Sequence, residues 1–163
     1  MGFFAAAGFG LMLACPTVLA SEEANRLGMQ GIRLIQEGKP EKGFALLRQA
    51  TLLEPDDALW RLRLGSLLMQ YAQGLTGMSD GLQSELLMND AEMEIRQALD
   101  LLPPQAKQLR GEGYYLLGQI YSAGYGFREA ARPYFQRAVE ENPTHAGAKQ
   151  ALTRLDQISA SLP

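Results

Sequence analysis

The same spacing of small and large residues before a proline occurs three times in this 163-residue chain. The stretches are GFALLRQATLLEP from Gly43, AEMEIRQALDLLP from Ala91 and ARPYFQRAVEENP from Ala131. Each has a small residue, a large apolar residue four positions later, an alanine after three more and a proline after a further five. In a helix the small, large and alanine positions share one face, and the small side chains let another helix approach closely. The spacing therefore predicts three packed helices of one kind.

Proline should end each of these helices, because it cannot continue a helix and biases the preceding residue away from helical geometry. Asp56 and Asp57 follow Pro55, and Thr144 follows Pro143. These side chains can accept hydrogen bonds from the first amides of a helix. We therefore expect a new helix soon after each proline.

A second pattern precedes each stretch: a glycine three residues before an apolar side chain. The pairs are Gly31 with Leu34, Gly65 with Leu68 and Gly118 with Tyr121. A glycine inside a helix costs about 1 kcal/mol relative to alanine, so it usually marks a close crossing. The repeated unit is thus a helix with a glycine notch, a turn, and a second helix that ends before proline.

This unit resembles the tetratricopeptide repeat (TPR), a helical hairpin of 34 residues. Residues 24–57 fit that length, residues 58–105 fit at both ends around an insertion at 72–85, and residues 111–145 fit best. The resemblance covers almost the whole chain after residue 20. It implies an all-α fold, a right-handed stack of about three repeats that together span residues 21–163 with a final helix.

That final helix is expected at 146–160, where apolar residues recur at helical spacing. It should cap the open apolar face of the last repeat, as such stacks require. Seven helices are expected in total.

The insertion, AQGLTGMSDGLQSE from Ala72, is the most individual feature of the chain. In one interpretation two helices of the repeat are each extended by a turn or two, with Ser79 or Asp80 capping the second. In the other it forms a protruding hairpin that touches a partner or a membrane. Its contacts would then come from Leu75, Met78 and Leu82.

The first twenty residues contain no charged side chain and end in Val18-Leu19-Ala20, a small-residue cleavage pattern. We expect residues 1–20 to be an export signal, although no lysine or arginine opens it. An uncleaved membrane anchor is the alternative. Either leads to a periplasmic or membrane-anchored protein.

Cys15 is the only cysteine. The stretch from Met12 to Cys15 is similar to a bacterial lipobox, in which the cysteine is lipidated. An incidental apolar cysteine inside the leader is the other interpretation.

Little in the chain suggests chemistry on a substrate. The net charge of −3 argues against nucleic acid as a partner. His145 is the only histidine and is expected in an exposed turn, so no metal pair exists. Acidic pairs are expected at helix starts (Glu22-Glu23, Asp56-Asp57) or on a solvated face (Glu140-Glu141). We predict no enzyme activity, no metal and no cofactor.

The resemblance implies a concave groove lined by the first helix of each repeat. Its positions fall on Asn25, Gly28, Ile32, Ile35 and Gln36; on Leu59, Leu62, Ser66, Met69 and Gln70; and on Glu112, Tyr115, Gln119, Ser122 and Ala123.

Such a groove is mostly apolar, with amides and hydroxyls, and suits an amphipathic or extended apolar segment of a partner. Met69 and Tyr115 are the favoured contacts. Alternatively, some of these side chains pack against one another or the capping helix. Some relatives clamp a chaperone's terminal carboxylate with lysine and asparagine; Gly28 and Ile32 stand there instead, which argues against that partner.

The expected function is therefore a non-catalytic adaptor for protein partners of the bacterial envelope, in the assembly of a secretion, pilus or polysaccharide machine. Oligomeric state stays open. A periplasmic carrier of an apolar ligand or lipid is the alternative.

Overall fold

The protein is an array of seven helices in the part of the chain that the computed structural model describes, residues 16–75, 81–123 and 128–161. They are α1 (Pro16–Gln36), α2 (Pro40–Leu53), α3 (Ala58–Gly74), α4 (Gly81–Leu101), α5 (Lys107–Ala123), α6 (Arg128–Glu141) and α7 (Ala146–Ser161). These described ranges hold no strand. The all-α prediction is confirmed.

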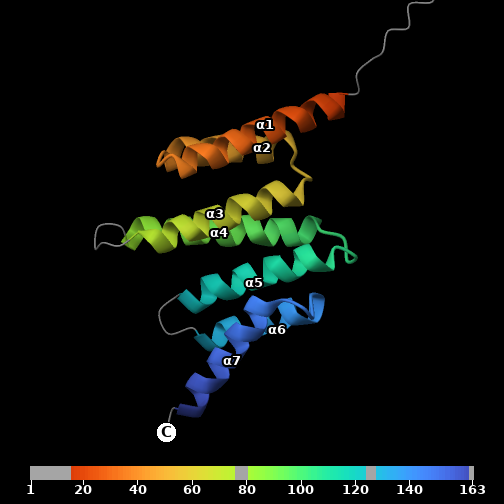
Figure 1. Ribbon diagram of the computed structural model, residues 1–163. Coiled ribbons are helices and arrows are strands. Elements are labelled where there is room, and N and C mark those ends of the chain that lie inside the picture. Colours follow the sequence, from red (N-terminus) through yellow and green to blue (C-terminus); the bar gives the residue numbers. More distant parts are fainter. Residues whose placement is uncertain (1–15, 76–80, 124–127, 162–163) are drawn as a thin grey trace, which may run out of the picture.

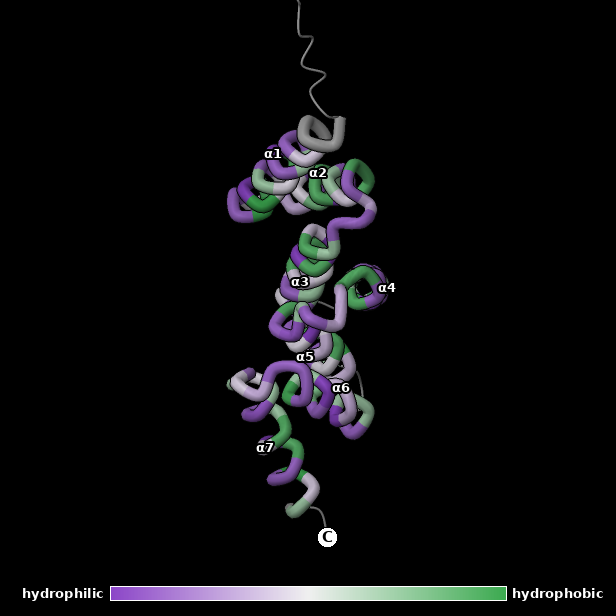
Figure 2. Tube along the Cα trace, turned by 90° about the vertical axis from the view of Figure 1, so that its right-hand side faces the viewer, coloured by the Kyte–Doolittle hydropathy of each residue, from purple (hydrophilic) through white to green (hydrophobic). Residues whose placement is uncertain are grey.

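Consecutive helices pair as hairpins, and the hairpins stack along one axis (Figure 1). The pairs are α1 with α2, α3 with α4 and α5 with α6, and α7 follows at the far end. Seen from the side, α1, α3 and α5 form one layer and α2, α4 and α6 the other (Figure 2). A site shared by several repeats can therefore be built from one helix of each hairpin.

The three prolines act as predicted. Helices α2, α4 and α6 each end two residues before one, at Leu53, Leu101 and Glu141. Asp57 caps α3, since its Oδ1 accepts a 2.8 Å hydrogen bond from the Leu59 amide.

Thr144 does not cap α7, contrary to expectation. Its hydroxyl donates to Oδ1 of Asn142 (2.7 Å). The first turn of α7 is instead capped by Nδ1 of His145, which accepts from the Ala148 amide at 3.2 Å.

The repeated small and large positions make the core. Leu47, Ile95 and Phe135 are at most 3% exposed, and the alanines that follow them are fully buried. The glycine notches are real crossings. A Cβ on Gly31 would lie 2.7 Å from the Gly43 carbonyl oxygen, and one on Gly118 would lie 2.5 Å from the Phe135 ring. Neither position has room for a larger side chain.

The joint between the first and second hairpins is mainly apolar, with one exposed ion pair between Arg48 on α2 and Asp90 on α4 (2.6 Å). The ring of Trp60 lies on Gly28, where an added Cβ would be 2.2 Å from the indole, and Trp60 is 1% exposed. About three turns farther along α3, the rings of Tyr71 and Phe44 on α2 meet edge to face at 5.6 Å. Close contact of aromatic rings with backbone therefore holds α3 against α1 and α2.

The joint between the second and third hairpins is tied by arginines. Nη1 of Arg110 donates to the carbonyls of Leu99 (3.3 Å) and Leu102 (3.2 Å), at the C-terminal end of α4. Nε of the same side chain pairs with Glu141 at 3.0 Å. The predicted solvated face for Glu141 is wrong, because its side chain is only 16% exposed and neutralised by Arg110.

A second arginine cluster lies at the same joint. Arg96 donates to the hydroxyls of Tyr121 (3.1 Å) and Tyr134 (2.9 Å), whose rings stack at 4.8 Å. Tyr121 in turn donates to Glu92 at 2.8 Å. This hydrogen bond to a carboxylate, with one to Tyr134 and partial burial, raises the pKa of Tyr121 to about 12.

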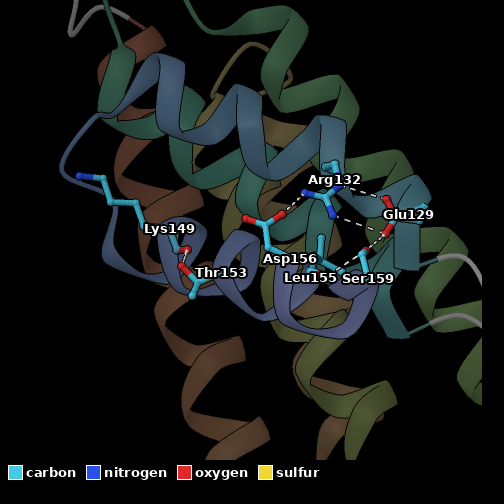
Figure 3. Close-up of polar contacts among 7 residues, drawn as sticks. All are labelled: Glu129, Arg132, Lys149, Thr153, Leu155, Asp156 and Ser159. Carbon is cyan, nitrogen blue, oxygen red and sulfur yellow. Dashed lines mark hydrogen bonds and ion pairs between the residues drawn. The ribbon is translucent and has the colours of Figure 1, made fainter. Parts of the chain in front are cut away.

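Helix α7 is attached to α6 by apolar and polar contacts. Leu155 packs with Ala131 and Phe135 in a small buried cluster. Figure 3 shows the polar part: Arg132 bridges Glu129 (3.0 Å) on its own helix and Asp156 (2.6 Å) on α7. This helix covers the last hairpin, as expected of a capping helix.

The described part of the insertion lengthens a helix. Helix α4 has 21 residues, against 14 in α2 and α6, and begins at Gly81. Leu75 is half-buried and Leu82 is 70% exposed. Met78, Ser79 and Asp80 lie outside the described residues.

Helix α1 begins before the predicted cleavage pattern and includes it. Glu22 and Glu23 therefore lie within α1, not at a helix start as expected. Cys15 lies outside the described residues. Among the described helices, none is both long and apolar enough to cross a membrane.

Candidate functional site

A pocket of about 330 Å³ lies between three first helices of the hairpins. Helix α1 contributes Ile32, α3 contributes Leu59, Leu62, Arg63, Ser66 and Leu67, and α5 contributes Leu109, Glu112 and Leu116. We call it the α1–α3–α5 pocket. It exists because each hairpin places its first helix in the same layer (Figure 2).

The pocket has a buried base and an accessible rim. Leu62 and Leu116 are 5% and 4% exposed, whereas Leu59 and Leu109 are 39% and 38% exposed. An apolar cavity of about 150 Å³ holds a benzene molecule, so this pocket has room for about two large apolar side chains. The rim leucines are available to anything that enters.

One cation at the pocket forms no ion pair with the part of the chain that the structure describes. Helices α1 and α3 contain four arginines, of which Arg26, Arg33 and Arg61 pair with Glu23, Glu37 and Glu94. Within the described residues Arg63 has no carboxylate partner; its guanidinium lies 4.7 Å from the centre of the Trp60 ring. The indole thus holds the fourth arginine at the pocket by a cation–π contact.

A carboxylate lies on the α5 side of the same pocket. Oε2 of Glu112 is 3.1 Å from Nε2 of His145. Since Nδ1 of His145 accepts from the Ala148 amide, the neutral ring carries its proton on Nε2 and donates it to Glu112. Glu112 is therefore the acceptor in this hydrogen bond.

His145 is not the exposed turn residue that the sequence suggested. Its side chain is 11% exposed and its ring lies 4.5 Å from that of Tyr115. It links α5 to the start of α7 and is structural in this position.

Three of the predicted groove residues of the third repeat lie at a different place. Tyr115, Gln119 and Ser122 line a second pocket of about 220 Å³, together with residues of α6 and α7. The Tyr115 hydroxyl accepts from Gln119 (3.0 Å), and a Cβ on Gly147 would lie 2.9 Å from the Tyr115 ring. Tyr115 therefore packs against the capping helix, the alternative that the sequence left open.

Two other predicted contacts point away from the pocket. Met69 is 3% exposed in the core, so its predicted place in the groove is wrong. Ile35 packs within the first hairpin, where a Cβ on Gly43 would lie 2.5 Å from its Cγ1.

The remaining predicted positions divide. Ile32, Leu59, Leu62, Ser66 and Glu112 are brought together in the pocket. Asn25, Gln36 and Gln70 are exposed on α1 and α3, and Ala123 is exposed at the end of α5. The space beside Gly28 is occupied by the ring of Trp60.

Sequence reasoning missed Arg63, Leu67, Leu109 and Leu116. Helix α5 begins at Lys107, four residues before the start assumed for the third repeat at 111. Leu109 was therefore not counted as part of the repeat. A signal was present, because positions 109, 112 and 116 share one helical face.

Comparison with other proteins identifies the fold. No known family and no curated protein matches this sequence. Two solved structures are similar along most of the chain: the first TPR of Spaghetti (RPAP3) bound to the HSP90 peptide SRMEEVD, and the first TPR domain of human RPAP3, determined by NMR.

Sequence identity is 19% with the first and 17% with the second, and the TM-score is 0.57 for both. The match covers 86% of this chain in each case, and 96% and 95% of the other chains. This chain has the fold of a TPR domain. Within the described residues, no group of three His, Cys, Asp or Glu side chains could hold a metal ion.

Proposed function

We propose that the protein is a non-catalytic adaptor that binds an apolar or amphipathic segment of a partner protein in the α1–α3–α5 pocket. The observation that carries this proposal is the pair of rim leucines, Leu59 and Leu109, above a buried apolar base. Burying one leucine-sized side chain contributes about 1.5–3 kcal/mol. Two such side chains in the pocket are enough for a selective contact.

The similarity to a TPR domain solved with a bound peptide supports a peptide as the ligand class. The mode of binding must differ from a clamp that needs a lysine at position 28. A Cβ there would lie 2.2 Å from the Trp60 ring, so the first helix cannot carry a side chain at this point. Apolar contacts in the pocket take its place.

The proposal extends to an exported protein that helps assemble a complex of the bacterial envelope, with or without lipidation at Cys15. The uncharged apolar stretch over residues 1–20 supports export. The mass of the mature N-terminus checks this part: cleavage after Ala20, lipidated Cys15 and a retained leader give three different masses.

A carrier of lipid is less well supported by the geometry. The pocket takes about two large side chains, and its rim leucines are more than a third exposed. An acyl chain held there would leave much of its length in water, at about 0.8 kcal/mol for each unburied methylene.

Site-specific photo-crosslinking in native cells tests the function. p-Benzoylphenylalanine replaces Leu59 or Leu109 at the pocket, and Leu52 on α2, which is 78% exposed, serves as the matched control. We expect one and the same protein adduct from positions 59 and 109 and none of it from 52. Adducts of lipid mass would favour the carrier, and equal adducts from all three positions would contradict a role for the pocket.

A further inference from the structure

The unpaired Arg63 gives the pocket a charge preference. It is the one arginine of α1 and α3 without a carboxylate partner in the described part of the chain. Its guanidinium lies 4.7 Å from the centre of the Trp60 ring, and turning away would lose this cation–π contact. A ligand that supplies a carboxylate here replaces water around a cation that is already in position.

The apolar surface next to Arg63 defines the rest of the ligand. Leu59 lies one helical turn before Arg63, and Leu67 one turn after it, and both line the same pocket. If a carboxylate of the ligand pairs with Arg63, the side chains next to it in the ligand contact Leu59 and Leu67.

We propose that the α1–α3–α5 pocket selects partner segments in which an aspartate or glutamate stands next to a pair of large apolar residues. The carboxylate pairs with Arg63 and the apolar pair enters between Leu59 and Leu109. This proposal rests on the proposed function and names the chemistry of its ligand.

Glu112 sharpens the preference. Its carboxylate lines the α5 side of the pocket and accepts a hydrogen bond from His145. A second acidic group of the ligand would be repelled there. The selected segment should thus carry its acid at one end only, toward α3, and neutral or basic residues toward α5.

Selection from a phage-displayed library of random 12-residue peptides tests this preference and does not require the cellular partner to be identified first. The protein is used as wild type, as Arg63→Glu and as Lys42→Glu. Lys42 is an exposed cation on α2, which contributes nothing to the pocket, so the control changes net charge by the same amount.

Wild type and Lys42→Glu should enrich peptides with an acidic residue within two positions of an apolar pair. Arg63→Glu should lose that acidic preference and gain a basic one while the apolar pair persists. Arg63→Gln, which removes the charge without reversing it, should lose the preference and gain none. Circular dichroism of Arg63→Glu shows whether the charge reversal disturbs packing on Trp60. If it does, Arg63→Gln alone tests the charge preference.

One enriched peptide is then synthesised with its acid and with the corresponding amide. The amide should bind wild type about fivefold more weakly, as expected for a partly exposed ion pair. It should bind Arg63→Gln as well as the acid does.

Two results would overturn the proposal in distinguishable ways. If wild type and both Arg63 variants enrich the same peptides at the pocket, the charge preference is wrong and the adaptor function stands. If wild type enriches no apolar peptide at all, both fail.

Discussion

Different kinds of contact hold successive hairpins together at the two joints of the stack. Between the first and second hairpins, the rigid Trp60 ring lies on a glycine backbone. Between the second and third, Arg110 and Arg96 span the gap with hydrogen bonds to carbonyls, carboxylates and phenols. We therefore expect added volume to be most harmful at the first joint and the loss of a hydrogen-bond partner to be most harmful at the second.

The difference also determines where the ligand pocket can form. At the first joint the tryptophan fills the space under α3 and holds Arg63 at the surface. At the second joint Arg110 contacts the end of α4 and Glu141 at the end of α6, and Arg96 contacts Tyr121 and Tyr134. Neither arginine lines the pocket, where Leu62, Leu109 and Leu116 meet in the first-helix layer. The pocket lies between the two joints, where α1, α3 and α5 of the three hairpins meet.

Removing the tryptophan should be the most damaging change. We expect Trp60→Ala to lower the free energy of unfolding by about 4 kcal/mol, because truncating a buried aromatic leaves a cavity. Urea denaturation followed by circular dichroism measures it. Leu52→Ala, at a side chain that is 78% exposed, is the control and should change stability by less than about 0.5 kcal/mol. A similar small loss for Trp60→Ala would mean that the first joint is not tightly packed.

Adding volume at the same joint should be almost as harmful. Gly28→Ala should cost about 2–3 kcal/mol, since the new methyl overlaps the Trp60 ring. Gly74→Ala, where no atom lies within 4 Å, should be neutral or stabilising by up to about 1 kcal/mol.

The double mutant separates overlap from other causes. In a Trp60→Ala background, Gly28→Ala should lose its cost, because nothing remains for the methyl to overlap. An equal cost in both backgrounds would rule out the indole as the reason for this glycine.

The polar joint should respond to the loss of a partner. Arg110→Ala should cost about 2 kcal/mol, because it removes hydrogen bonds to the last carbonyls of α4 and leaves Glu141 unpaired at 16% exposure. Arg110→Lys should recover less than half, since an ammonium group lacks the forked donors that reach α4 and α6 together. Full recovery by lysine would show that charge alone matters there. Denaturant unfolding of the three proteins gives the comparison.

The second joint should also lose stability at alkaline pH. The pKa of Tyr121 is raised to about 12 by its hydrogen bond to Glu92, from an ordinary value near 10. The folded state then holds this proton more tightly than the unfolded state. The contribution to stability is complete below about pH 10 and disappears as the pH rises through about 12.

A Tyr121→Phe variant is the control, because it removes the titrating group and nearly preserves the ring. Wild type should lose more unfolding free energy than this variant between pH 10 and 12. Parallel curves would show that Tyr121 does not carry the effect.

The fold was predictable because the sequence repeats its packing face. Leu47, Ile95 and Phe135, with the alanines after them, occupy equivalent positions in the three hairpins, and each proline follows its helix by two residues. Small residues at a crossing and a residue that cannot continue a helix act locally, so spacing along the chain is enough to recognise them.

The site was predictable only in part, because α3 is apolar on most of its surface. Leu62, Leu64, Leu68 and Met69 are all buried, so periodicity alone does not separate the side that meets α1 from the side that meets the pocket. The family's groove positions, carried over, therefore placed Met69 at the surface and omitted Arg63. For Tyr115 the sequence left two possibilities open, because only the position of α7 decides whether it lines the α1–α3–α5 pocket or packs against the capping helix.

Binding of the segment crosslinked at Leu59 tests the central claim most directly. Its affinity should be measured for wild type, Leu59→Asp, Leu109→Asp and the exposed control Leu52→Asp. We expect a loss of at least about tenfold for the two pocket variants, because each removes the burial of a leucine-sized group, and no change for the control. Equal affinity for all four proteins would contradict the α1–α3–α5 pocket as the binding site.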